Sequence, residues 1–199
     1  MQKYIFSREI RNEYRSILGL DGSYVLGHVG RMTYAKNYPF ILDVFSCIAK
    51  LREDAILLLV GDGPEIQLIK NRIKEIGLES RVRLLGFRYD VPALLQAMDV
   101  LLLPSHYEGL PIIAIEAQAA GLPCLVSEGI AAESVFTDLI TRLSLHETPE
   151  KWAEAALSHD TLCRHSDLSA ISASRYELDD EVRRLQEIYK ATGFDTSKH

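Results

Sequence analysis

The chain has 199 residues and a formal net charge of -6 at pH 7; 47% of its residues are hydrophobic and 25% are charged. This composition is that of a soluble globular protein long enough to bury one substantial core, so we expect a single domain. The acidic balance argues against a nucleic-acid partner, which would require a basic excess along the chain. Lysine and arginine gather only in short clusters, which we interpret as solvated helix or strand faces. Examples are Lys70, Arg72 and Lys74, and Arg81, Arg83 and Arg88.

The cysteines and the hydropathy pattern indicate the compartment. Cys47, Cys124 and Cys163 are widely spaced, form no C-x-x-C pair, and occur in apolar or helical surroundings. Such cysteines are typical of small buried hydrophobic residues rather than metal ligands, which indicates a reducing compartment. No segment reaches the ~18 apolar residues needed to span a bilayer, and the first residues, "MQKYIFSREIRNEYRS", lack the apolar core of a signal peptide. We therefore expect a cytoplasmic protein.

Short apolar runs alternate with longer amphipathic segments, and this alternation is typical of a parallel sheet flanked by helices. Runs that are apolar throughout, such as "AILLLV" and "VLLL", indicate strands covered on both faces. A weaker sixth strand is expected near "LITRLSL", residues 139–145. The five stronger predicted strands are Tyr24–Val29, Ala55–Val60, Arg81–Leu85, Asp99–Pro104 and Pro123–Glu128.

Helices are predicted between these strands. Pro64 and Pro111 suit a first helical turn, because proline has no N–H to lose there. Gly77 and Gly121 suit the residue just past a helix end, where glycine adopts the left-handed conformation without strain. The four predicted helices are Asn37–Leu51, Pro64–Ile76, Val91–Met98 and Pro111–Ala120.

Two further helices are expected beyond the sheet. Thr148 is a predicted N-cap with Pro149 in the first turn, and the tail "LDDEVRRLQEIYKATG" has the apolar spacing of an amphipathic helix. Since the chain shows no internal repeat and no low-complexity linker, residues 1–199 are predicted to form one domain. Its expected parts are a leading helix at about 1–20, a core over 21–145 and C-terminal helices over 146–199.

Right-handed crossovers between such strands give a three-layer α/β/α sandwich around a parallel, Rossmann-like sheet of about six strands. Ligands bind sheets of this kind at the carboxyl ends of the strands. We therefore expect the ligand site among the segments that follow the strands. These segments are rich in glycine and charge: Gly30–Arg31, Gly61–Pro64, Gly86–Asp90 and Ser105–Pro111.

The helix predicted to begin near Pro111 offers an anion site. The N–H groups of a first helical turn have no partners within the helix, and Gly109 lets the chain approach a ligand closely. Because Pro111 itself has no N–H, a phosphate would rest against Gly109, Leu110 and Ile112.

Charged residues on and opposite this helix extend the prediction. Arg31 and Lys36 follow the first strand, and two cations facing a helix N-terminus hold a diphosphate better than a single phosphate. Taken alone, each could be an ordinary loop charge. Glu116 lies about one and a half turns into an otherwise apolar helix, where an unpaired carboxylate is costly. The two hydroxyls of a ribose would satisfy it, since an ionised carboxylate only accepts hydrogen bonds; the alternative is a structural ion pair with a neighbouring helix.

Four segments, in this order along the chain, carry a resemblance to a known protein family: "GHVGRMTYAKN", "LLLVGDGPEIQLIK", "RVRLLGFRYDVPALLQAMDVLLLPS" and "EGLPIIAIEAQAAGLPCLVSE". The last contains an E-x7-E element formed by Glu108 and Glu116. In this ordered set the chain resembles the C-terminal, nucleotide-sugar-binding domain of GT-B glycosyltransferases of family GT4, also called group 1. The resemblance covers about residues 8–133 closely and the final helix loosely.

The resemblance implies transfer of a hexose, with retention at the anomeric carbon, from a nucleotide-diphosphate sugar. UDP-hexose donors and roles in polysaccharide or glycoconjugate biosynthesis are the common pattern among bacterial members. Arg31 and Lys36 would neutralise the diphosphate, and Glu116 would bind the ribose hydroxyls. Glu108 would contact the transferred sugar and the distal phosphate. The catalytic residues implied are therefore Glu108, Arg31 and Lys36.

The resemblance also implies how the base is held and which cofactors are needed. The loops around Gly61 and Phe87–Arg88 would bind the base, largely through main-chain groups. No metal and no other cofactor are expected, because side-chain cations and the helix dipole stabilise the charge that a metal would otherwise neutralise. The donor-binding residues implied are Gly30, Arg31, Lys36, Gly61, Phe87, Arg88, Glu108, Gly109, Leu110, Ile112 and Glu116.

Some features depart from the family pattern. Ala131 and Ala132 precede Glu133 where a second glycine is usual, so the contact of this loop with the donor is in question. The segment "VFTDLITRLSLHE" replaces a glycine-bearing turn and apolar strand, which blurs the sixth strand. None of the six histidines is an evident substitute for the family's catalytic histidine: we expect His28 in the core and His106 at most in contact with the donor.

The chain begins about where the second domain of a GT-B enzyme begins. The resemblance thus implies that the acceptor, a sugar or a lipid-linked glycan, is bound by an N-terminal domain that this sequence lacks, and that the full enzyme associates peripherally with a membrane. We expect this chain alone to bind the donor and to transfer the sugar poorly or not at all.

Three other functions compete with the transferase. A non-catalytic nucleotide-sugar-binding regulatory module, or a subunit of a split transferase, would share the same site. A nicotinamide-dependent oxidoreductase is disfavoured because "GHVGRMTYAKN" lacks the G-x-G-x-x-G spacing after the first strand. A phosphoacceptor receiver domain would need clustered acidic residues at the strand ends, which Asp62 and Asp99 do not supply.

Overall fold

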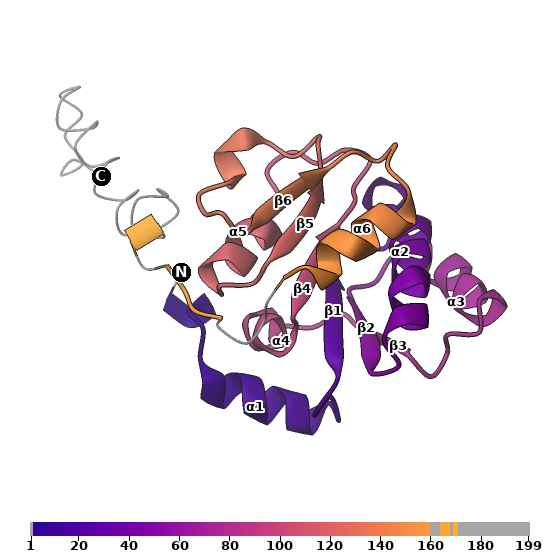
Figure 1. The fold of residues 1–199 in the computed structure, drawn as a ribbon, viewed down its shortest axis with the longest axis horizontal. Coiled ribbons are helices and arrows are strands. Elements are labelled where there is room, and N and C mark those ends of the chain that lie inside the picture. The colour runs from indigo at the N-terminus through magenta and orange to yellow at the C-terminus, as the bar shows by residue number, and fades with distance from the viewer. Residues whose placement is uncertain (1, 160–163, 168, 171–199) are drawn as a thin grey trace, which may run out of the picture.

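Six strands form one sheet in the order β3-β2-β1-β4-β5-β6, and every neighbouring pair is parallel. This is the arrangement in the computed structural model, which describes residues 2–159, 164–167 and 169–170 (Figure 1). The order is that of a doubly wound Rossmann sheet, and its direction of winding reverses between β1 and β4. The strands are β1 (Tyr24–Val29), β2 (Ala55–Val60), β3 (Val82–Gly86), β4 (Val100–Leu103), β5 (Cys124–Ser127) and β6 (Ile140–Leu143).

The strand predictions are confirmed to within two residues, and the sixth strand is present at the edge beside β5. β3 is displaced by one residue along the chain, since it begins at Val82 rather than Arg81 and ends at Gly86 rather than Leu85. The N–H groups of Arg81 and Val82 both bond to the carbonyl of Leu78, so the preceding turn retains Arg81. At the other end of β3, the register with β2 shifts between Leu59 and Val60, which allows Gly86 to pair.

Helices cover both faces of the sheet and complete the three layers that the sequence predicts (Figure 1). Buried side chains of α2 and α6 pack on one face, together with those of α3. Those of α4 and α5 pack on the other face, with residues that flank α1. The helices are α1 (Arg8–Ile17), α2 (Tyr38–Leu51), α3 (Ile66–Glu75), α4 (Val91–Ala97), α5 (Ile112–Ala119) and α6 (Pro149–Leu157).

The helix ends agree with the predictions at glycine and threonine and differ at the two prolines. Gly77 and Gly121 follow helices with φ of 67° and 61°, and the side chain of Thr148 accepts a hydrogen bond from the N–H of Lys151. By contrast, neither Pro64 nor Pro111 lies in a first helical turn.

The reason differs at each proline. Pro64 belongs to the turn of residues 63–66, in which the N–H of Ile66 bonds to the carbonyl of Gly63, so α3 begins only at Ile66. Pro111 is the N-cap of α5 and has extended backbone angles, with φ of -77° and ψ of 92°. The helix therefore begins one residue later than predicted, at Ile112.

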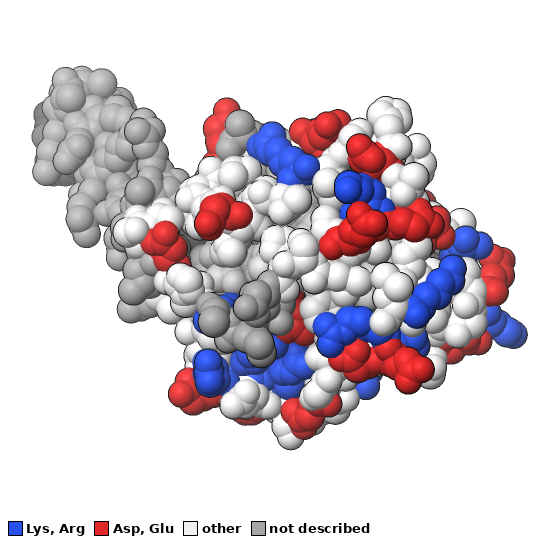
Figure 2. Space-filling view, in the orientation of Figure 1, with Lys and Arg blue, Asp and Glu red and all other residues white. Residues whose placement is uncertain are grey.

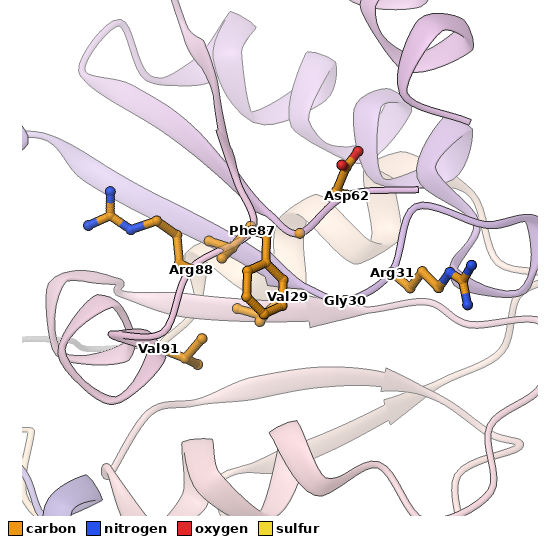
Figure 3. A pocket seen from close by; sticks show the side chains of 9 residues that line it. Val29, Gly30, Arg31, Asp62, Phe87, Arg88 and Val91 are labelled. Atoms are coloured by element: carbon orange, nitrogen blue, oxygen red, sulfur yellow. The ribbon is translucent and has the colours of Figure 1, made fainter. Parts of the chain in front are cut away.

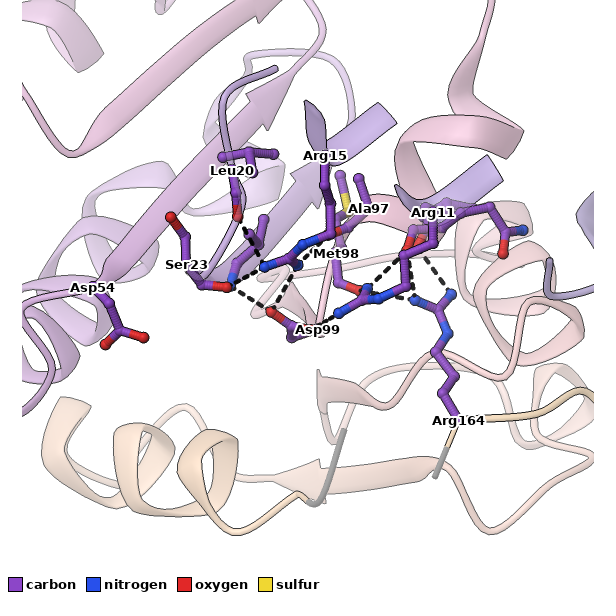
Figure 4. Close-up of polar contacts among 12 residues, drawn as sticks. Arg11, Arg15, Leu20, Ser23, Asp54, Ala97, Met98, Asp99 and Arg164 are labelled. Atoms are coloured by element: carbon purple, nitrogen blue, oxygen red, sulfur yellow. Dashed lines mark hydrogen bonds and ion pairs between the residues drawn. The ribbon is translucent and has the colours of Figure 1, made fainter. Parts of the chain in front are cut away.

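A cluster of arginines fastens α1 to the end of α4 (Figure 4). Asp99, directly before β4, accepts from Arg11 at 2.5 Å and from Arg15 at 3.3 Å. Arg164, from the segment after α6, donates to the carbonyls of Leu95, Gln96, Met98 and Ala120. These bonds satisfy carbonyl groups at the C-terminal ends of α4 and α5, which have no partners within their helices.

Some predictions fall outside the residues that the structure describes. The tail helix predicted over residues 178–193 and the environment of Cys163 lie there. Cys124 is buried as expected, whereas Cys47 is partly exposed. Within the described part of the chain, no helix combines the length and the apolar character needed to cross a membrane.

Candidate functional site

The carboxyl ends of β1 and β4 mark the point where the sheet reverses direction, and ligands bind Rossmann-like sheets in the crevice at this point. Two loops meet there: residues 30–37 after β1 and residues 104–111 after β4. The N–H of His106 donates to the carbonyl of Ala35 at 2.9 Å and ties one loop to the other. The Oγ of Ser127 donates to the carbonyl of Ser105 at 2.6 Å and ties the second loop to β5.

Backbone hydrogen bonds also join the ends of the first three strands. The N–H of Gly30 bonds to Val60, and the N–H of Gly61 bonds to Gly86, at 2.9 and 2.8 Å. Gly61 has φ of 131°, and a Cβ there would overlap the carbonyl group of Gly30. Glycine at position 61 is therefore required both by the backbone angle and by the close approach of the two strand ends.

A largely apolar pocket opens above these strand ends (Figure 3). Its volume is about 420 Å³, which is within the range of small-molecule sites. The ring of Phe87 lies at its centre, Val91 lies on the side nearer Arg88, and the guanidinium groups of Arg88 and Arg31 lie at opposite ends (Figure 3). The pocket is lined by Val29, Gly30, Arg31, Val60, Gly61, Asp62, Phe87, Arg88 and Val91.

A second, more polar cleft of about 520 Å³ adjoins this pocket and shares part of its wall. The shared residues include Gly30, Arg31 and Arg88. The cleft extends from the loop after β1 to the start of α5 and reaches the N-terminal segment of the chain. Its other lining residues are Lys3, Tyr4, Val29, Lys36, Tyr89, Val91, Pro92, Glu108, Leu110, Pro111, Ile112, Ile113 and Glu116.

The cations of the cleft are held differently. Arg31 is exposed and makes no side-chain hydrogen bond or ion pair with any residue that the structure describes. Lys36 forms an ion pair with Glu108, whose Oε2 also accepts from the Oγ of Ser105 at 3.2 Å. An anion between the two loops would therefore meet Arg31, which has no such partner among the described residues, and Lys36, which already has one.

Arg88 is fixed at the mouth of the cleft. Its guanidinium donates two parallel hydrogen bonds to Asp90, at 2.8 and 2.5 Å, and the hydroxyl of Tyr14 donates to the same carboxylate. The bond from Arg88 is the largest cause of the low pKa of Asp90, about 2. Two parallel bonds orient the guanidinium group, so Arg88 presents a positive charge in a defined place.

The start of α5 faces the cleft. The first hydrogen bond within the helix is donated by Ala114 to the carbonyl of Pro111, at 2.9 Å. The N–H groups of Ile112 and Ile113 precede that bond, and helix geometry leaves them available to an anion. Leu110 and Pro111 complete this wall, whereas Gly109 is exposed in the loop and is not among the lining residues.

Glu116 lies at the fifth position of α5 and lines the same cleft. Its side chain is partly buried, and burial raises the pKa of its carboxyl group. A hydrogen bond from the hydroxyl of Tyr4 and the positive charge of Lys3 act in the opposite direction. The structural ion pair with a neighbouring helix, which was the alternative from the sequence, is not formed by the residues that the structure describes.

His28 is buried in the core, as predicted from the sequence, and its ring lies beneath the loop after β1. Its Nδ1 lies 2.7 Å from the carbonyl of Leu102, which requires a proton on Nδ1, and its ring packs edge-on against Tyr38. Tyr38 in turn donates to the carbonyl of Gly30 at 3.0 Å. A Cβ on Gly30 would lie 3.2 Å from Nε2 of His28, so the loop backbone rests directly on this ring.

The apolar pocket and the polar cleft together are lined by ten of the eleven donor-binding residues predicted from the sequence, and Gly109 is the exception. Sequence reasoning missed Lys3 and Tyr4, which it assigned to a leading helix. Neither position carries a local signal, since Tyr4 is 112 residues from its partner Glu116. Tyr89 was also missed, although its place beside Phe87 in an exposed "GFRYD" loop was a usable signal.

Charge on the molecular surface is mixed. On the face shown in Figure 2, acidic and basic side chains are interspersed, without a continuous basic stripe. Among the residues that the structure describes, no three His, Cys, Asp or Glu side chains come close enough to hold a metal ion together.

Fold and strand order define a doubly wound α/β domain, and its cleft lies at the reversal point of the sheet, where ligands bind folds of this kind. The chain belongs to the group 1 glycosyltransferases, because the family model described as "Glycosyl transferases group 1" matches residues 10–159. Its solved structural neighbours are GT-B glycosyltransferases. One is Anabaena Alr3699/HepE in complex with UDP, with a TM-score of 0.79, 23% identity, and coverage of 96% of this chain and 55% of that protein.

Curated relatives agree with the family. The chain is 40% identical over 134 residues to the Bacillus subtilis protein named putative glycosyltransferase EpsF. The aligned region covers 65% of this chain and 34% of that protein. It is 41% identical over 115 residues to the Escherichia coli UDP-Gal:alpha-D-GlcNAc-diphosphoundecaprenol alpha-1,3-galactosyltransferase. Here the aligned region covers 56% of this chain and 30% of that protein. The matched region thus spans about a third of each of these relatives.

Proposed function

We propose that the cleft binds a nucleotide-diphosphate sugar and presents the sugar for transfer to an acceptor. The observation that carries the proposal is the meeting of three features in one cleft. These are the cations Arg31 and Lys36, the start of α5, and the carboxylate of Glu116. Each feature alone has ordinary structural explanations, but together they match the successive parts of a nucleotide-diphosphate sugar.

Each part of the donor has a place in this arrangement. The diphosphate lies between Arg31, Lys36 and the first N–H groups of α5, where positive charge and helix dipole act on it together. The ribose diol donates to Glu116, one turn deeper along the helix. The base occupies the apolar pocket beside Phe87, and the transferred sugar lies near Glu108.

The chemistry proposed is hexosyl transfer with retention. The bond between the anomeric carbon and the diphosphate oxygen breaks, and its electron pair stays on that oxygen. The acceptor hydroxyl oxygen bonds to the anomeric carbon, and its proton passes to the departing diphosphate. Arg31, Lys36 and the N-terminus of α5 stabilise the charge that develops on the leaving group, so no metal ion is required in the proposal.

The relatives support UDP as the first nucleotide to test. The Escherichia coli relative is named for a UDP-galactose donor, and the Anabaena structure contains UDP. We propose a role in polysaccharide or glycoconjugate biosynthesis at the cytoplasmic side of a membrane. The acceptor, a sugar or lipid-linked glycan, is proposed to be bound by an N-terminal domain that acts together with this one, and the present chain alone is expected to transfer poorly.

Calorimetric titration of the chain with UDP, GDP and ADP tests the proposal. We expect at least one nucleotide to bind, and Glu116→Ala and Arg31→Ala each to weaken it by about 1–3 kcal/mol, the range for losing one charge-assisted group. Arg72→Ala is the matched control, because Arg72 lies on α3 and pairs with Asp43, outside both the apolar pocket and the polar cleft. Binding that is equally strong in all three variants would show that the site is elsewhere.

A further inference from the structure

The N-terminal segment contributes a side chain to the proposed nucleoside site. Residues Gln2–Tyr4 form a single 3-10 turn, and Lys3 and Tyr4 both line the cleft that contains Glu116. The hydroxyl of Tyr4 donates to Oε1 of Glu116. Only 8% of Tyr4 is exposed, so its ring is part of the cleft wall rather than a mobile surface group.

The position of Tyr4 is fixed by contacts that do not involve Glu116. Gln96 of α4 donates from Nε2 to the carbonyl of Tyr4 at 3.1 Å, and its Oε1 accepts from the N–H of Ser7 at 3.2 Å. The N–H of Phe6 donates to Oγ of Ser166 at 2.8 Å. The segment is thus held from two sides, and the phenol hydroxyl is brought to Glu116 by its backbone.

We propose that Tyr4 is a positioning residue of the nucleoside site: its hydroxyl holds Oε1 of Glu116 and leaves Oε2 to accept hydrogen bonds from the ribose diol. The inference rests on the proposed function of the cleft. It adds a residue that acts through Glu116 rather than by touching the reacting atoms.

Two physical effects support this role. Burial raises the pKa of Glu116, whereas the hydrogen bond from Tyr4 lowers it and so favours the ionised carboxylate. The ionised form is the one that accepts both ribose hydroxyls. A carboxylate that is already held also loses less rotational freedom when the nucleotide binds, which increases affinity.

The test compares UDP with 2′-deoxy-UDP, which lacks one of the two ribose hydroxyls. Both are titrated calorimetrically into the wild-type chain, Tyr4→Phe and the control Tyr24→Phe. Tyr24 also loses a phenol hydrogen bond, donated to the carbonyl of Ala156 at 2.6 Å, but it begins β1 at the far end of the strand from the cleft. Thermal unfolding of each variant verifies that it is folded.

We expect Tyr4→Phe to weaken UDP binding about 3- to 10-fold, as for one lost hydrogen bond, and to reduce the preference for UDP over 2′-deoxy-UDP. Tyr24→Phe should leave affinity and preference unchanged. Three results would overturn the inference: unchanged UDP affinity in Tyr4→Phe, equal weakening of both nucleotides, which would indicate a merely structural role, or tighter UDP binding, which would show that the phenol competes with the ribose. If the wild-type chain bound GDP or ADP rather than UDP, the comparison would be made with that nucleotide and its 2′-deoxy form. If it bound none of the three, the proposed function would fail first and the inference with it.

Discussion

The ammonium group of Lys36 and the carboxylate of Glu108 form an ion pair that joins the loops after β1 and β4. The two side chains are 17% and 20% exposed, so the pair is partly shielded from water. Both residues belong to the proposed donor site, and a diphosphate would compete with Glu108 for the same cation. The cleft therefore contains a carboxylate of the chain itself where the donor would place its own negative charge.

Replacing this carboxylate should favour the nucleotide product. In Glu108→Gln, Lys36 is released and the repulsion between Glu108 and a diphosphate is removed. We expect UDP to bind about 3- to 10-fold more tightly, a difference of about 1 kcal/mol for a partly exposed charge pair. The gain should shrink at high salt, because the affected interactions are ionic. Unchanged or weaker UDP binding in calorimetry at low salt would contradict this explanation.

The arginine cluster at Asp99 should contribute strongly to stability (Figure 4). Asp99 accepts from Arg11, Arg15 and the N–H of Val25, and its side chain is only 4% exposed. Asp99→Asn leaves buried guanidinium groups without a charged partner, so we expect a loss of about 3 kcal/mol or more in the free energy of unfolding.

Asp54→Asn provides the matched control for Asp99. Asp54 pairs with Arg52 at the surface, with side chains 39% and 42% exposed, and exposed pairs contribute less than about 1 kcal/mol. Urea denaturation of the two variants measures the difference. Equal losses of unfolding free energy in both variants would show that the cluster around Asp99 contributes no more to stability than a surface ion pair.

Gly61 should tolerate substitution less well than another glycine with positive φ. Gly61→Ala adds a Cβ that overlaps the carbonyl group of Gly30, in addition to the unfavourable backbone angle. Gly77 also has positive φ, but nothing lies within 4 Å of a Cβ there. We expect Gly77→Ala to lower the free energy of unfolding by about 1 kcal/mol and Gly61→Ala to lower it by about 3 kcal/mol, as measured by urea denaturation. Only Gly61→Ala should weaken UDP binding.

His28 should make stability depend on pH. Burial lowers the pKa of His28 to about 4, from 6.5 for an ordinary histidine. Since the folded-state pKa is depressed, the unfolded chain takes up a proton first as the pH falls, and folding loses stability between about pH 6.5 and 4. The loss from this group is about 3 kcal/mol.

His28→Asn tests this titration. Asparagine can still donate to the carbonyl of Leu102, but it has no group that titrates in this range. The variant should therefore be less stable than the wild type at pH 7 and lose less stability than the wild type on acidification. Parallel pH profiles of the unfolding free energy in the two proteins would show that His28 does not titrate as described.

The strand pattern and the resemblance together predicted most of the fold and the place of the cleft. Apolar runs such as Ala55–Val60 are local signals, and a parallel sheet necessarily brings the residues after its strands to one edge. Helix starts were less well predicted, because a proline such as Pro64 or Pro111 is compatible with a turn, with an N-cap and with a first helical turn. Only the backbone hydrogen bonds of the folded chain distinguish these cases.

What the sequence could not predict are the contacts between distant segments. Tyr4 and Glu116, or Arg164 and the carbonyl of Leu95, carry no spacing that marks them as partners. Arg15 belongs to an amphipathic helix whose polar residues are expected at the surface. It is nevertheless buried, because its guanidinium donates hydrogen bonds to the carbonyls of Leu20, Ser23 and Ala97. Such pairings depend on how the layers pack, and local patterns do not encode them.

A crystal structure of the chain soaked with UDP would test the central proposal most directly. We predict density for the diphosphate between Arg31, Lys36 and the first N–H groups of α5, with the ribose hydroxyls within hydrogen-bonding distance of Glu116. Nucleotide density at any other place on the molecule, or a ribose turned away from Glu116, would contradict the proposal.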